Sequence, residues 1–98
     1  MIVKIHNVNG KRIIAIIDKS LVGKKIEEGR LQLDCAADFY QGEEKNEEEI
    51  KHLAQSAYIL NIVGEKSIQF CIKQRWVNKN NVVRIKNVPH AEVLMTTE

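Results

Sequence analysis

Apolar and polar residues at the start of the chain follow the period expected of β-strands. Two runs rich in β-branched residues, at positions 2–7 and 11–17, flank the dipeptide Asn9-Gly10. Asn-Gly readily adopts the positive φ angles of a two-residue hairpin turn. The pattern therefore predicts an antiparallel hairpin as the first structural unit.

Two shorter strands are predicted after this hairpin. Polar residues and Gly23 mark a turn or short helical bend at 18–23, and strands are expected at 24–27 and 30–35. In the second of these strands apolar and polar residues alternate, which predicts a half-buried strand. Its inward-facing positions are Leu31, Leu33 and Cys35.

The middle of the chain carries helix signals. Asn46 is a good N-cap, Glu49 stands at the capping-box position, and the intervening carboxylates suit the first turn of a helix. We expect one helix from here to a break at Gly64. Its predicted apolar stripe is Ile50, Leu53, Ala54 and Ala57, widened by Tyr58, Leu60 and Ile62.

A second helix is predicted at 65–75, with Ile68, Cys71 and Ile72 on its buried face, and two strands are predicted at 82–85 and 90–95. The order of strands, two helices and strands predicts an α+β fold. We expect a two-layer sandwich in which two consecutive helices pack on one face of a mostly antiparallel sheet. The length of 98 residues suits a single domain, 1–98, and disorder is expected only at 96–98.

Charge is strongly polarised along the chain. Residues 34–49 include seven carboxylates and one lysine, whereas residues 66–91 include six cations and no carboxylate. A basic face attracts phosphate backbones, so these cations are candidate nucleic-acid-binding residues. They are Lys66, Lys73, Arg75, Lys79, Arg84 and Lys86. Trp76 is either a stacking partner for bases or a core anchor at the end of the helix.

Metal and cofactor signals are weak. Three histidines and two isolated cysteines have no zinc-ligand spacing, and the five glycines form no nucleotide-binding loop, so we expect neither a metal nor a cofactor. Cys35 and Cys71 lie in apolar patterns and are predicted to be reduced, buried thiols. With no leader or membrane-spanning stretch, a cytoplasmic protein that makes no membrane contact is expected.

Asn61 falls on the apolar stripe of the predicted first helix, where its amide needs hydrogen-bond partners. Those partners are either backbone groups of the sheet or of the break at Gly64, or members of a polar site formed with Glu65 and His90. His90 follows Pro89, and three roles are considered for its side chain: a general base, a hydrogen-bond donor to phosphate, or an edge residue of the sheet. The last is the default.

Several short runs in the sequence resemble one known family. They are 61–65 (Asn-Ile-Val-Gly-Glu), 88–91 (Val-Pro-His-Ala), Asp18 with 21–24 (Leu-Val-Gly-Lys), and the opening hairpin. With these features the whole chain is similar to the small archaeal proteins catalogued as domain of unknown function 424. The resemblance implies an archaeal cytosolic protein with an α+β fold, and it brings no established activity or family site.

Three functions follow as hypotheses. The first is a non-enzymatic binding module whose basic surface contacts RNA or a ribonucleoprotein. The second is a protein-interaction module or self-associating dimer, in which the acidic region of one copy, or an acidic partner protein, meets the basic region of the neighbouring copy. The third is a small enzyme or ligand binder that uses Asn61, Glu65 and His90.

Overall fold

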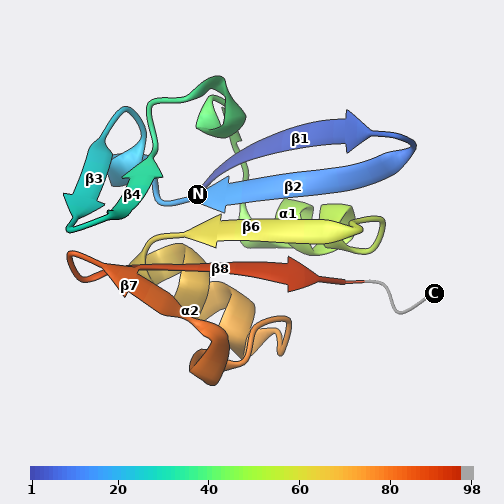
Figure 1. Ribbon diagram of the computed structural model, residues 1–98. Coiled ribbons are helices and arrows are strands. Elements are labelled where there is room, and N and C mark those ends of the chain that lie inside the picture. Colours follow the sequence, from blue (N-terminus) through green and yellow to red (C-terminus); the bar gives the residue numbers. More distant parts are fainter. Residues whose placement is uncertain (96–98) are drawn as a thin grey trace.

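The computed structural model describes residues 1–95, and a six-stranded sheet forms its centre (Figure 1). The strand order is β5-β1-β2-β6-β8-β7, with one parallel pair, β2 with β6. Its strands are β1 (Ile2–Val8), β2 (Lys11–Ile17), β5 (Glu43–Glu44), β6 (Ile59–Val63), β7 (Val83–Ile85) and β8 (Val88–Leu94). The α+β fold and its mostly antiparallel sheet are thus as the sequence predicts.

Strands β1 and β2 form the predicted hairpin. Asn9 and Gly10 have φ angles of 52° and 78°, as a two-residue turn of the primed type requires. All seven residues of β1 pair with β2, from Ile2 with Ile17 to Val8 with Lys11. This register sets which backbone groups of β1 point away from β2.

Two helices, α1 (Glu47–Ala54) and α2 (Glu65–Lys73), cover one face of the sheet. The predicted capping box at the start of α1 is present: the Glu49 amide donates to the Asn46 side chain, and the Asn46 amide donates to Glu49. Between helices and sheet lies the larger apolar core. Its sheet residues include Ile14, Ile16, Leu60 and Ile62, and its helix residues include Ile50, Ile68 and Cys71.

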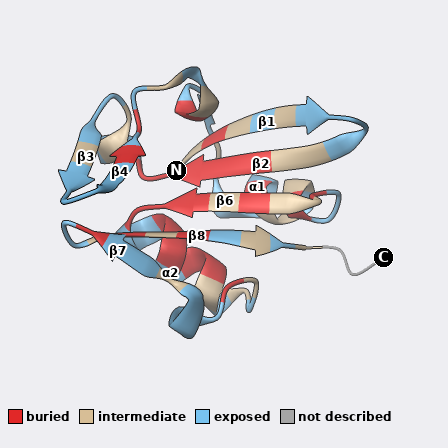
Figure 2. Cartoon of the chain, in the orientation of Figure 1, coloured by how far each residue is buried: buried red, intermediate tan, exposed pale blue. Residues whose placement is uncertain are grey.

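The opposite face of the sheet is only partly covered. A second hairpin, β3 (Lys25–Glu28) with β4 (Leu31–Asp34), and the short helix η2 (Asp38–Tyr40) pack over one half of it. The short helices η1 (Lys19–Leu21) and η3 (Lys79–Asn81) complete the fold. Figure 2 shows β2 and β6 buried at the covered half, whereas toward the Gly10 turn β2 becomes intermediate and then exposed and β6 alternates between intermediate and buried positions.

The prediction of one helix reaching Gly64 is wrong. The helix ends at Ala54, and the run 59–63 is the central strand β6, which lies between α1 and α2 along the chain. Leu60 and Ile62 face the helices while Val63 packs in the core of the opposite face. A strand buried on both faces is apolar at nearly every position, so a helical stripe can be traced through it as well.

The junction between β6 and α2 depends on Gly64 and Asp18. Gly64 has φ 108° and ψ 155°, a region that essentially only glycine adopts. The buried Asp18 carboxylate accepts hydrogen bonds from the Lys66 amide at 3.0 Å, the Ser67 amide at 2.8 Å and the Ser67 hydroxyl at 2.7 Å. An aspartate from the end of β2 thereby caps the first turn of α2.

No helix among residues 1–95 is long and apolar enough to cross a membrane. The positions predicted to be disordered, 96–98, lie outside the described residues.

Candidate functional site

Asn61 lies on β6, on the partly covered face of the sheet. Its side-chain oxygen accepts a hydrogen bond from the Tyr40 hydroxyl at 3.4 Å, and its amide nitrogen donates to Glu92 at 3.5 Å. Burial, followed by the nearby Cys35 and Glu92, raises the pKa of Tyr40 to about 12, so its hydroxyl keeps the donated proton. Asn61 therefore bonds neither to the predicted backbone groups nor to the predicted site with Glu65 and His90; both predictions of its partners are wrong.

His90 and Glu65 lie on different sides of the sheet. Ala91 packs against the helices, so His90 points to the opposite face together with Asn61. The expectation of an edge position for His90 is wrong, because β8 lies between β6 and β7. Its buried Nδ1 has no hydrogen-bond partner among residues 1–95.

Glu65 begins α2 on the helix side, and its carboxylate accepts hydrogen bonds from the two terminal guanidinium nitrogens of Arg84, from Nη1 at 2.8 Å and from Nη2 at 3.3 Å. These hydrogen bonds lower the pKa of Glu65 and raise that of Arg84. The structure therefore brings Asn61 and His90 to one face and leaves Glu65 out of that group.

Both cysteines are free and fully buried, as the sequence predicts. Burial raises the pKa of Cys71 to about 12, and burial with the nearby Asp34 raises that of Cys35. A nucleophilic thiolate is therefore disfavoured at either position. Within residues 1–95, no three His, Cys, Asp or Glu side chains gather into a group that would hold a metal ion.

The six predicted nucleic-acid-binding cations are all exposed, and they lie on or beside α2, η3 and β7. Arg84 is paired with Glu65, whereas the other five form no ion pair with any described residue. Trp76 is half-buried and packs edge-on against Phe70 at the core, with 5.7 Å between the two ring centroids. Of its two predicted roles the structure supports the core anchor.

A feature that the sequence does not reveal is the free edge of β1. In a hairpin with a two-residue turn the flanking pair exchanges both backbone hydrogen bonds, so Val8, His6 and Lys4 point their backbone groups toward β2. The backbone groups of Ile5 and Asn7 point away from it. The neighbour on that side, β5, pairs only with Ile2 and Val3, so among residues 1–95 the outward groups of Ile5 and Asn7 have no strand beside them.

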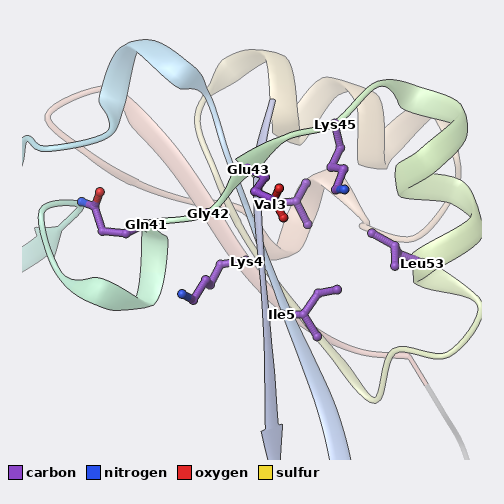
Figure 3. Close-up of a pocket in the computed structure, with 8 residues that line it drawn as sticks. All are labelled: Val3, Lys4, Ile5, Gln41, Gly42, Glu43, Lys45 and Leu53. Atoms are coloured by element: carbon purple, nitrogen blue, oxygen red, sulfur yellow. The ribbon is translucent and has the colours of Figure 1, made fainter.

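A groove runs along this edge, between β1 and α1 (Figure 3). One part, of about 380 Å³, is lined by β1 at 3–5, by 41–43 and by Lys45 and Leu53. A second part, of about 390 Å³, shares Lys45 and Leu53 and continues along α1 to His52. In Figure 3 Ile5 and Leu53 lie on one side of β1 and Lys4 lies on the other.

The groove combines two kinds of binding group. The free edge offers unpaired backbone donors and acceptors, and Ile5, which is 37% exposed, provides apolar surface next to Leu53. Gly42 closes one end, where its Cα passes so close to the Val3 carbonyl that a Cβ atom would overlap it. An extended chain segment is the shape that fits beside such an edge.

The fold and this groove define a small α+β domain with an open sheet edge. The chain belongs to the family described as "Protein of unknown function (DUF424)", whose model matches residues 6–95. A solved structure described as an uncharacterized conserved protein from Methanopyrus kandleri has the same fold, with a TM-score of 0.82 at 17% sequence identity. The match covers 99% of this chain and 92% of that one. A search of curated proteins found no match.

Proposed function

We propose that this protein is an interaction module that binds an extended segment of a partner protein by strand addition to the free edge of β1. The observation that carries the proposal is the mismatch between β1, with seven residues, and β5, with two. Strand addition uses main-chain hydrogen bonds for affinity and pockets for alternate side chains for specificity. Both components are present along the β1–α1 groove.

The groove also suggests the chemistry of the bound segment. Side chains of an added strand alternate between the two faces of the sheet. Those on the helix side would enter the space between Ile5 and Leu53, which favours apolar residues of moderate size at every second position. The expected ligand is therefore an extended peptide with alternating apolar residues.

A proline at Asn7 tests the mode of binding. The Asn7 amide points outward, so Asn7→Pro removes a donor for the incoming strand and leaves the β1–β2 hydrogen bonds in place. Asn7→Val is the matched control, because it keeps the amide and suits a strand. The probe is a library of random peptides displayed on phage and selected on the wild-type protein.

We expect selected peptides to bind Asn7→Val as they bind the wild type and to bind Asn7→Pro at least about tenfold more weakly, the loss expected when a backbone donor is removed and its acceptor is left unpaired. Equal binding to both variants would contradict strand addition.

RNA contact is a second candidate function, supported by the five exposed cations without a carboxylate partner among residues 1–95. The two buried free cysteines suit a reducing compartment, so for either function we place the protein in the cytoplasm. The cations at the end of α2 and in η3, Arg75 and Lys79, would contact the phosphates.

Heparin affinity and copurifying nucleic acid test this candidate. If RNA binds, the double variant Arg75→Glu/Lys79→Glu should elute from heparin at clearly lower salt than the wild type, and nuclease should remove absorbance at 260 nm. The control Lys11→Glu/Lys25→Glu changes net charge equally, away from α2 and η3. Equal elution of the two double variants would contradict a specific basic surface.

A further inference from the structure

A second groove, of about 630 Å³, lies between the start of α1 and the outer side of α2. Apolar side chains of Met1, Phe70 and Ile72 contribute to its lining, together with the charged side chains of Glu47, Lys66 and Lys73. None of its lining residues lines the β1–α1 groove. Here the acidic and basic regions of the sequence meet in space.

The charges around this groove are of both signs and are unpaired. Glu47 lies in the first turn of α1, and Lys66 and Lys73 are two turns apart on α2, which places them on one side of that helix. Among residues 1–95 none of the three is within 4.0 Å of an opposite charge. Opposite charges thus face one opening without neutralising each other.

This arrangement selects against most occupants. A polyanion would be repelled by Glu47, and a basic segment would be repelled by Lys66 and Lys73. The occupant that complements the groove has an apolar centre with both charge signs at matching positions. A second copy of the same surface has this pattern, because a two-fold axis that passes between the two patches places each patch against the opposite patch of its partner.

We propose that the protein forms a two-fold symmetric dimer through the α1–α2 groove. Glu47 of each copy lies against Lys66 and Lys73 of the other, and the apolar side chains of Met1 and Ile72, which are only partly buried in one copy, become covered in both. The two-fold operation pairs the two charge patches twice in each dimer. The β1 edges lie outside this interface, so the dimer presents two strand-addition sites.

Charge-swap variants test the dimer. Glu47→Lys leaves only cations at the three positions, and Lys66→Glu/Lys73→Glu leaves only carboxylates. Each variant alone places like charges across the two-fold axis, so its dimer dissociation constant should rise by about tenfold or more. An equimolar mixture of the two variants restores opposite charges at both contacts.

The measurement is sedimentation velocity at low and high salt. We expect a dimer of the wild type at low salt that weakens as salt screens the charges, monomers of each variant, and a dimer again in the mixture. The control Lys79→Glu/Lys86→Glu has the same charge change outside the groove and should remain dimeric. Glu47→Gln, which keeps the size of the side chain, should weaken the dimer without like-charge repulsion.

A wild type that stays monomeric at low salt and high concentration would overturn the proposal, as would a mixture of the two variants that stays monomeric. Variants that remain fully dimeric would also overturn it, because the interface would then lie elsewhere. Peptide binding at the β1 edge is measured separately with the Asn7 variants. Failure of the dimer is therefore distinguishable from failure of strand addition.

Discussion

Replacing Gly64 with alanine should destabilise the protein through two separate effects. The φ of 108° and ψ of 155° lie in a region that costs other residues about 1–3 kcal/mol. A Cβ atom at this position would also lie 2.6 and 2.7 Å from the two carboxylate oxygens of Asp18. The carboxylate must then move away from the start of α2.

The second effect is the larger one. Displacing Asp18 weakens three short hydrogen bonds, to the Lys66 amide and to the amide and hydroxyl of Ser67. Loss of a capping side chain costs about 0.5–2 kcal/mol, and leaving buried polar groups unpaired adds about 1–3 kcal/mol. Together with the backbone cost, these ranges sum to a loss of about 2.5–8 kcal/mol in the free energy of unfolding for Gly64→Ala. Such a loss is a large fraction of the stability of a typical domain.

A double-mutant cycle separates the two effects. In an Asp18→Ala background there is no carboxylate to displace, so Gly64→Ala should cost only its backbone part, about 1–3 kcal/mol. Urea denaturation followed by Trp76 fluorescence gives all four free energies. The reasoning would be refuted if Gly64→Ala cost the same in both backgrounds, or less than about 1 kcal/mol in the wild type.

Two further predictions concern buried titratable groups. The pKa of Tyr40 is about 12 in the folded protein against an ordinary value of 10.0, so its contribution to stability is present below pH 10 and is lost as pH rises toward 12. In urea denaturation, the free energy of unfolding of Tyr40→Phe should fall less over this pH range than that of the wild type. Equal falls for the two proteins would contradict the assignment. Cys35 and Cys71 are buried with raised pKa values, so a thiol reagent should label them only on unfolding; rapid labelling of native protein would contradict this.

Local signals explain the parts of the fold that could be predicted from sequence. The Asn9-Gly10 turn and the Asn46–Glu49 capping box act within a few residues, and both are present as predicted. The helix prediction failed at 59–63, because the apolar residues of this run suit a helix stripe and a buried strand equally well. Its pairing with β2, more than forty residues earlier in the chain, decides the outcome, and no local pattern encodes that contact.

The candidate sites could be predicted only in part. The sequence predicts that Asn61 needs hydrogen-bond partners, but Tyr40 and Glu92 reach it only through tertiary structure. The free edge of β1 arises because the segment 41–45 runs beside β1 for only two residue pairs, Ile2 with Glu44 and Val3 with Glu43. The separation of acidic and basic residues along the chain can be read from the sequence. That Glu47 lines the same groove as Lys66 and Lys73 cannot, because it depends on how the two helices pack on one face of the sheet.

The most direct test of the strand-addition function is hydrogen exchange of the backbone amides, measured by NMR with and without a peptide selected on the wild-type protein. In the free protein the amides of Ile5 and Asn7 should exchange quickly while those of Lys4, His6 and Val8 are protected. Bound peptide should protect Ile5 and Asn7. A peptide that binds while these two amides continue to exchange quickly would contradict the account.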